Sequence, residues 1–362
     1  MSLPPPRPGI MDITPYVGGE SEISGVKDII KLASNEGAFG PSPKAVAAYD
    51  ELSGKLHRYP DGGCAKLRKA LGEMNGLNSE QIVCGAGSDE LLGLLCRAYA
   101  GPGDEVLYTE HGFLMYPIAA RTAGATPVKA PEIGLTANVD ELLKKVTPKT
   151  RIVFLANPNN PTGTYLGMRE MERLRASLPD SALLVIDAAY AEFVAAEDYA
   201  PGIEMVNNGA DVVMTRTFSK IYALGGVRLG WAYCPPGIAD VLNRVRNPFN
   251  VGSPAQAAGL AALADHEFTE RAYRHNLKWL TWTEQRLRDM GLQGPASVGN
   301  FVLARFPDEA GRRAEDADAF LKRRGIIVRR ITAYGLPDYL RITIGREDEM
   351  HAVVGALEEF MQ

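Results

Sequence analysis

The sequence predicts an α/β fold in which a larger domain, built on a mostly parallel β-sheet, is followed by a smaller α+β domain. Three observations lead to this prediction. The chain has 362 residues, which at the usual domain size suggests two domains. Short apolar runs alternate with amphipathic stretches through its middle, as is typical of parallel strands covered by helices on both faces. After Pro254 the pattern changes to long helical stretches.

Seven apolar runs are the predicted strands of the larger domain: Gln81–Cys84, Glu105–Thr109, Thr126–Lys129, Arg151–Ala156, Leu183–Ile186, Val212–Thr215 and Leu229–Tyr233. Helical patterns lie between several of them: Ser88–Tyr99, Val139–Lys144, Gly167–Leu178 and Gly202–Asn207. For the smaller domain we expect helices over 255–290, a strand at 300–306, a helix near 315–325, a strand at 339–344 and a helix at 347–361.

Prolines mark the two ends of the larger domain. Four of them, at positions 4, 5, 6 and 8, oppose helix formation and strand pairing, so residues 1–15 should be extended. Asn247-Pro248 and Ser253-Pro254 interrupt the pattern near its other end. We therefore expect an N-terminal arm (1–30), a larger domain (31–250) and a smaller domain (251–362) that part of the N-terminal segment completes.

Composition excludes several classes of function. The net charge of −5 argues against nucleic acid as a partner, because neutralising phosphates needs an excess of Lys and Arg. No run of eighteen apolar residues suggests a membrane span, and no signal peptide is recognisable at the start. The four cysteines form no metal-binding pattern and are expected as buried thiols. We expect a cytoplasmic protein without a metal site.

Ligands of parallel α/β sheets bind beyond the carboxyl ends of the strands, so the polar residues that follow each apolar run are the candidate site. The first such segment is Gly85–Glu90, which opens a helix. Its glycines and first-turn N–H groups, with Gly87, Ser88 and Asp89, suit a phosphate. An ordinary capped turn is the alternative. A dinucleotide fingerprint would need glycine where Glu90 stands.

Two further segments supply an amide, a carboxylate and a phenol. Asn157–Gly163 contains two X-Pro steps and a glycine, a stiff turn that would hold the amide of Asn160 in place. Asp187 ends a very apolar strand, with Tyr190 three residues later. A carboxylate there needs a cationic partner: an arginine, a metal or a protonated ring nitrogen. A metal is disfavoured because only Glu192 lies nearby as a second ligand, and a helix N-cap is the alternative.

The last segment combines an amine with a guanidinium. Lys220, preceded by Ser219, lies on a loop beyond a buried strand, where its pKa can fall and its amine can act as a nucleophile. A solvated lysine is the ordinary alternative. Arg228 follows between glycines and can clamp an anion. Together the four segments match the groups of pyridoxal 5′-phosphate, whose signature is a lysine Schiff base and an acidic partner of the pyridinium nitrogen.

The order of these motifs resembles the fold-type I pyridoxal-phosphate-dependent aminotransferases, and most closely the histidinol-phosphate aminotransferase family. The resemblance covers nearly the whole chain. It rests on Leu32–Glu36, Arg58–Asp61, Asn159–Gly163, Ser219-Lys220 and Tyr339–Gly345. It implies transamination of histidinol phosphate with 2-oxoglutarate by a ping-pong route, giving imidazole acetol phosphate and glutamate in histidine biosynthesis. Relatives that act on aromatic amino acids, or decarboxylate threonine phosphate, remain alternatives.

The resemblance also implies residue roles. Lys220 binds the cofactor covalently and shuttles the proton, Asp187 pairs with the ring nitrogen, and Asn160 and Tyr190 contact the 3′-oxygen. Phosphate ligands are Gly87, Ser88, Asp89, Ser219 and Arg228, with Asp89 orienting its neighbours or capping its helix. Phe113 stacks on the ring, where relatives often carry Tyr, and a phenylalanine of the apolar core is the alternative. Substrate contacts are Arg341, Arg329, Tyr16 and Asn35. Tyr59 reaches the phosphate of the neighbouring subunit, which makes a homodimer the catalytic unit.

Two other classes of function fit less well. A nicotinamide dehydrogenase needs the glycine that Glu90 replaces and an acidic residue at the end of the next strand. A cofactor-holding regulator needs a DNA-binding segment, and residues 1–30 are too short and too rich in proline to supply one.

Overall fold

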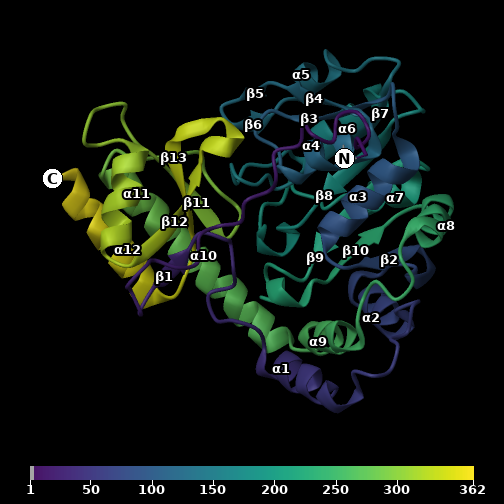
Figure 1. Cartoon of the computed structure of the whole chain (residues 1–362), viewed down its shortest axis with the longest axis horizontal. Helices are drawn as coiled ribbons and strands as arrows, with labels where there is room; N and C mark the ends of the chain where they lie inside the picture. Colours follow the sequence, from purple (N-terminus) through teal and green to yellow (C-terminus); the bar gives the residue numbers. More distant parts are fainter. Residues whose placement is uncertain (1–3) are drawn as a thin grey trace.

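The computed structural model describes residues 4–362, and its two larger sheets lie in two lobes (Figure 1). The larger sheet has the strand order β2-β10-β9-β8-β7-β3-β4. The strands of this sheet are β2 (Ile82–Gly85), β3 (Glu105–Thr109), β4 (Thr126–Ala130), β7 (Thr150–Ala156), β8 (Leu183–Asp187), β9 (Val212–Thr217) and β10 (Gly230–Tyr233). Only β10 runs antiparallel to its neighbours. The predicted mostly parallel seven-stranded sheet is confirmed.

Helices cover both faces of this sheet because successive strand residues point to opposite sides. Along β7, Ile152 and Phe154 join one apolar core, while Val153 and Leu155 join the other. The first core is closed by α3 (Ser88–Tyr99), α4 (Met115–Ala123) and α8 (Pro236–Val245). The second is closed by α2 (Ala65–Asn75), α5 (Val139–Leu143), α6 (Met168–Ser177), α7 (Ile203–Asn208) and α9 (Ser253–Leu263). This two-sided burial explains the continuous apolar runs in the sequence.

The smaller sheet has the order β1-β12-β13-β11. Its strands are β1 (Ile30–Leu32), β11 (Phe301–Arg305), β12 (Ile326–Ile331) and β13 (Leu336–Thr343). It packs against α10 (His266–Asp289), α11 (Ala314–Arg323) and α12 (Glu347–Met361), at the left of Figure 1. The strands predicted at 300–306 and 339–344 are confirmed. The helices predicted over 255–290 are α9 and α10, whereas the sequence prediction missed β1 and β12.

The remaining elements are short. Between β1 and α2 lies α1 (Pro43–Asp50), and a hairpin of β5 (Glu132–Ile133) and β6 (Thr136–Ala137) follows β4. Short 3₁₀ helices lie at Ser53–Lys55, Ser79–Gln81, Ala191–Phe193, Gly225–Val227 and Thr332–Tyr334. Residues 4–29 contain turns and bends but no helix or strand, and residues 1–3 of the predicted arm lie outside the described residues. The division into an arm and two domains stays a prediction.

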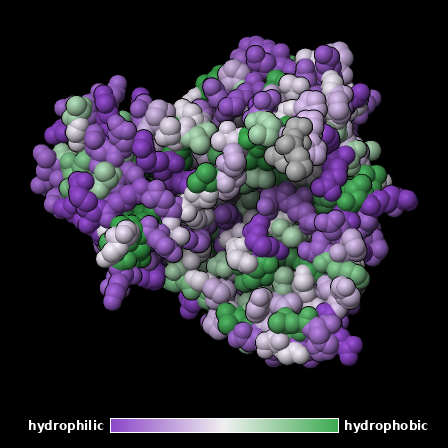
Figure 2. Space-filling view, viewed as in Figure 1, coloured by the Kyte–Doolittle hydropathy of each residue, from purple (hydrophilic) through white to green (hydrophobic). Residues whose placement is uncertain are grey.

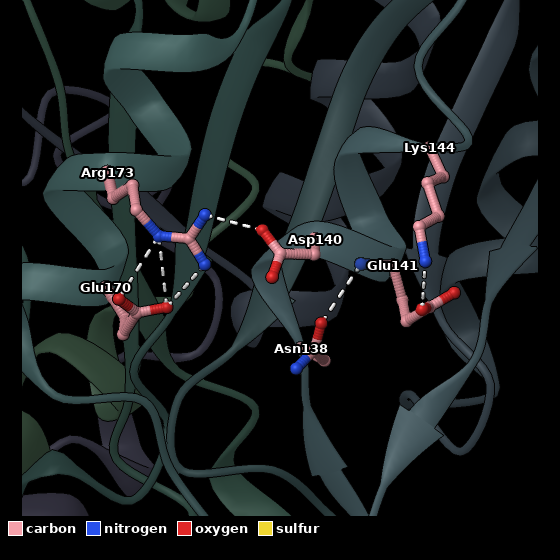
Figure 3. A network of polar contacts seen from close by, with 6 residues as sticks. All are labelled: Asn138, Asp140, Glu141, Lys144, Glu170 and Arg173. Atoms are coloured by element: carbon pink, nitrogen blue, oxygen red, sulfur yellow. Dashed lines mark hydrogen bonds and ion pairs between the residues drawn. The ribbon is translucent and has the colours of Figure 1, made fainter.

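A polar network joins two helices on the outside of the larger lobe (Figure 3). Arg173 of α6 bonds both Glu170 of its own helix and Asp140 of α5, and the side chain of Asn138 caps α5. The ion-paired side chains are largely solvent-exposed, so we expect each pair to contribute less than about 1 kcal/mol. None of these residues lines the cavity described below.

The molecular surface in the same orientation is mostly hydrophilic over the smaller lobe and recessed between the lobes (Figure 2). Within residues 4–362, no helix combines the length and apolar character that crossing a membrane requires. Cys64, Cys84, Cys96 and Cys234 are free and buried, which confirms the prediction made for them.

Candidate functional site

A cavity of about 380 Å³ lies where the two lobes meet, and residues of both line it. The larger lobe contributes side chains at or just beyond the carboxyl ends of β2, β7, β8 and β9, and the smaller lobe contributes side chains of β12 and β13. The arm adds Tyr16. Most of the residues singled out in the sequence therefore lie around one cavity.

Asp187 ends β8 and is 5% exposed. Its carboxylate accepts hydrogen bonds from the hydroxyl of Tyr116 at 2.9 Å and from that of Thr215 at 3.3 Å. Burial raises the pKa of Asp187 to about 6, against the effect of these two hydrogen bonds. The carboxylate thus lacks a cationic partner within its own lobe and is placed to receive one from a ligand in the cavity.

Lys220 follows β9 and its Nζ lies 3.4 Å from the carbonyl oxygen of Ser34 and 3.5 Å from that of Asn35. The same Nζ lies 5.7 Å from the centre of the Tyr190 ring. Burial, followed by the positive charge of Arg341, lowers the pKa of Lys220 to about 8. With this pKa about a tenth of the amine is unprotonated at pH 7, far more than for a solvated lysine, which favours its use as a nucleophile or a base.

The predicted phosphate segment lies at the amino end of α3. No side chain caps this helix, so its first-turn N–H groups are free for an anion. Gly87 adopts a φ of +92°, and a Cβ there would collide with the guanidinium of Arg228. Arg228 forms an ion pair with Asp89 at 2.6 Å and donates a longer bond of 3.5 Å to Ser219. The ion pair with Asp89 fixes the position of the Arg228 guanidinium, and the role of Asp89 at a phosphate site stays a prediction.

Asn160 and Tyr190 lie in the cavity wall, and each is already held by one partner. The side-chain oxygen of Asn160 accepts a hydrogen bond from Arg341. The hydroxyl of Tyr190 accepts one from the amide of Asn35 at 2.8 Å, and burial raises the pKa of this phenol. Asn35, predicted as a substrate contact, lines the cavity but uses its amide on Tyr190 and Thr343.

Two arginines face each other across the strand pair β12–β13. Arg329 and Arg341 are register partners, which places two like charges side by side. Arg341 is 5% exposed and bonds the carbonyl of Ala33 at 2.8 Å, but its Nε is buried without a partner. Arg329 bonds the carbonyls of Val17 and Gly18 in the arm. A pair of cations in this position favours an anionic ligand.

Aromatic side chains form another part of the wall. Tyr16 contacts Phe113 edge to face, with ring centres 6.4 Å apart, and Tyr334 of the smaller lobe also lines the cavity. Tyr59 is different. It is 83% exposed, stacks on Phe249 at 4.8 Å and lies outside this chain's own cavity.

Sequence reasoning missed three side chains that shape the site. Tyr116 and Thr215 hold Asp187, and Tyr334 closes the wall. Thr215 on β9 is the register partner of Asp187 on β8, so the two side chains lie next to each other. Predicting the strand pairing of β8 and β9 in register would have found it. Tyr116 and Tyr334 carry no comparable local signal.

Comparisons with known proteins agree with this site. The family model for aminotransferase class I and II matches residues 27–357. A histidinol-phosphate aminotransferase of Paramagnetospirillum magneticum is 64% identical, covering 100% of this chain and 99% of the relative. One of Rhodospirillum centenum is 58% identical, covering 100% of both. The crystal structure of histidinol-phosphate aminotransferase from Sinorhizobium meliloti with pyridoxal 5′-phosphate superposes with a TM-score of 0.89 at 29% identity, covering 99% of this chain and 98% of that one.

The matched model spans nearly the whole chain, and residues of every motif on which the resemblance rests, except Arg58–Asp61, line one cavity. The chain therefore belongs to the class I and II aminotransferase family and has the fold-type I architecture that its sequence predicts.

Proposed function

We propose that this chain transfers the amino group of histidinol phosphate to 2-oxoglutarate, giving imidazole acetol phosphate and glutamate, a step of histidine biosynthesis. The observation that carries the proposal is the full-length similarity, at 64% identity, to a relative with this name. The cavity supports it, because two guanidiniums and the rings of Tyr16 and Tyr334 suit a substrate with an anionic end and an imidazole ring.

The residues around the cavity fit pyridoxal 5′-phosphate. The uncapped start of α3, the close approach of Arg228 to Gly87 and the side chain of Ser219 would hold its phosphate. Asp187 is a buried carboxylate in need of a cation, and the protonated ring nitrogen would be that cation. Asn160 and Tyr190 would donate to the 3′-oxygen, and Phe113 would stack on the ring.

When bound, the cofactor supplies an aldehyde that takes up the amino group and a ring that accepts electrons. Lys220 would hold the cofactor at its aldehyde carbon, and its Nζ would accept the proton from the substrate carbon that bears the amino group. Asp187 keeps a proton on the ring nitrogen. Asp187 is buried and Lys220 is half-buried, so a bound cofactor would exclude water from both charges and strengthen each interaction.

Substrate recognition falls to the smaller lobe and the arm. Arg341 and Arg329 bind the phosphate of histidinol phosphate and, in the other half-reaction, a carboxylate of glutamate. Tyr16 covers the cavity and contacts the imidazole. The small-molecule site leaves no role for nucleic acid or a membrane in this proposal.

We also propose a homodimer in the cytoplasm. Tyr59 and Phe249 form an exposed aromatic stack, 83% and 44% exposed, which suits burial against a second copy and delivery of Tyr59 to the partner's phosphate site. Four free thiols suit a reducing compartment. Sedimentation at micromolar concentration tests the dimer, and a persistent monomer would contradict it.

A panel of amino donors tests the function. Histidinol phosphate, phenylalanine, tyrosine and threonine phosphate are compared with 2-oxoglutarate as acceptor. We expect the highest kcat/KM with histidinol phosphate. A preference for the aromatic amino acids, or release of carbon dioxide from threonine phosphate without transamination, would contradict the proposal. Borohydride should bleach the yellow holoenzyme and leave the reduced cofactor covalently attached to Lys220.

A further inference from the structure

The hydroxyl of Tyr190 has a fixed hydrogen-bond polarity. It accepts from the Nδ2 of Asn35 at 2.8 Å, and both residues are buried. A phenol has a single proton. Because Asn35 donates to the oxygen, the phenolic proton is left to be donated to a ligand in the cavity that Tyr190 lines.

Thr343 determines which end of the Asn35 amide faces Tyr190. The backbone N–H of Asn35 donates to Thr343 Oγ1 at 2.9 Å, and the Thr343 hydroxyl donates back to Asn35 Oδ1 at 3.2 Å. Thr343 is 3% exposed, so its proton needs a protein acceptor. A reversed amide would take away the acceptor that the structure provides, and the Nδ2 end therefore faces Tyr190.

The backbone of Asn35 is built for this contact. Its φ is +54°, in the left-handed region that asparagine tolerates better than most residues. Its carbonyl oxygen accepts from Asn300 at 3.0 Å and lies 3.5 Å from Lys220 Nζ. Asn35 is thus held by its N–H, its carbonyl and its side chain, which leaves its amide little freedom to rotate.

The second predicted partner of the 3′-oxygen is oriented from the same strand. Arg341, two residues before Thr343 on β13 and on the same face, donates to the side-chain oxygen of Asn160. That bond leaves the Asn160 NH₂ group free to donate. Strand β13 of the smaller lobe therefore orients both Asn160 and, through Asn35, Tyr190 as donors toward the cavity that they line.

We infer that Thr343 and Asn35 are positioning residues that fix Tyr190 as a hydrogen-bond donor to the 3′-oxygen of the cofactor. The inference rests on the proposed function. A donor at this oxygen stabilises its anionic form, and so lowers the pKa of the proton that the lysine-bound cofactor shares between its linking nitrogen and this oxygen. Loss of the donor's orientation should raise that pKa.

The test is a pH titration of the holoenzyme's visible absorption. We expect Thr343→Val to raise the midpoint by about 0.5–1 pH unit, as the weakening of one hydrogen bond allows. Thr343→Ser keeps the hydroxyl and should restore the wild-type midpoint. Asn35→Gly, which accepts the positive φ, should shift the midpoint in the same direction and covers the case in which Thr343→Val does not fold.

Thr283→Val is the matched control. Thr283 is also fully buried, and its hydroxyl donates to the carbonyl of Trp279 in its own helix. The midpoint of the absorption titration of Thr283→Val should equal that of the wild type. Unshifted midpoints in Thr343→Val and Asn35→Gly, or a Thr343→Ser shift as large as that of Thr343→Val, would overturn the inference. A wild-type protein that forms no lysine-bound chromophore would instead overturn the proposed function.

Discussion

The two halves of the cavity are built in different ways. On the larger-lobe side, Asp187, Lys220 and Asn160 each lie at or within four residues of the end of a buried parallel strand. On the smaller-lobe side, Arg329 and Arg341 lie within antiparallel strands and meet through their register. The first half depends on local sequence and the second on long-range pairing. We expect the first half to carry the chemistry and the second to carry substrate binding and orientation.

The largest effect is expected from Lys220→Ala, which removes the covalent anchor and the proton shuttle together. Turnover with histidinol phosphate should fall by more than about 10⁴-fold. The melting temperature should stay at or above that of the wild type without cofactor, because a buried amine is lost. Lys69→Ala, at an exposed position of α2, is the control and should be fully active. A Lys220→Ala variant with near-normal turnover would refute its role.

Arg341→Lys tests the smaller-lobe half. Lysine keeps the charge but cannot bond Asn160, Ala33 and a substrate anion with one planar group. We expect kcat/KM to fall by about 10²–10³-fold for both glutamate and histidinol phosphate, the usual loss for a buried charged contact. The control is Arg305→Lys, exposed on β11 of the same sheet. A loss confined to one of the two substrates would mean that they do not share this arginine.

The pH dependence of the free energy of unfolding tests Asp187, in the larger-lobe half of the cavity, in the cofactor-free protein. The pKa of Asp187 is about 6 when folded and about 3.8 when unfolded, so the folded state holds this proton more tightly. The free energy of unfolding should therefore fall by up to about 3 kcal/mol as the pH rises from 4 to 6 or above, relative to Asp187→Asn. Urea unfolding of both proteins at several pH values measures the difference. If the free energies of unfolding of the wild type and Asp187→Asn changed with pH in the same way, Asp187 would not be buried as described.

The smallest effect is expected from Arg329→Lys. Arg329 lies nearer to solvent than Arg341 and bonds the carbonyls of Val17 and Gly18, so its loss should loosen the arm over the cavity. We expect kcat/KM for histidinol phosphate to fall about tenfold. The neighbouring Arg330 pairs with the exposed Glu315, and Arg330→Lys should change nothing. Equal losses of kcat/KM in Arg329→Lys and Arg341→Lys would show that the two arginines contribute equally to substrate binding.

Most of the larger lobe could be predicted from the sequence. Its strands are buried on both faces and read as continuous apolar runs, and its polar site residues follow those runs directly. Lys220, Asp187 and Asn160 were recognisable for this reason. Their partners were not, because Tyr116 reaches Asp187 across the core, from a helix that the sequence prediction did not contain.

The smaller lobe was harder to predict because its contacts join distant segments. Strand β12 was missed because Arg329 and Arg330 interrupt its apolar run, although the strand is paired on both sides. Asn35 was assigned to the substrate, and only the pairing of its segment with β13 brings its amide to Thr343 and Tyr190. Such contacts follow from register, which a single sequence does not specify.

Strand β1 has a consequence for fragments of this protein. Ile30–Leu32 pairs in parallel with Ile326–Val328, and Leu32 is buried in the core of the smaller lobe. A truncated chain that starts at residue 251 would expose the N–H and C=O groups along β12, a template for intermolecular strand addition and aggregation. Co-expression with a peptide covering residues 27–36 should restore solubility. During synthesis, Ile30–Leu32 cannot form this pairing until Ile326–Val328, near the end of the chain, have left the ribosome.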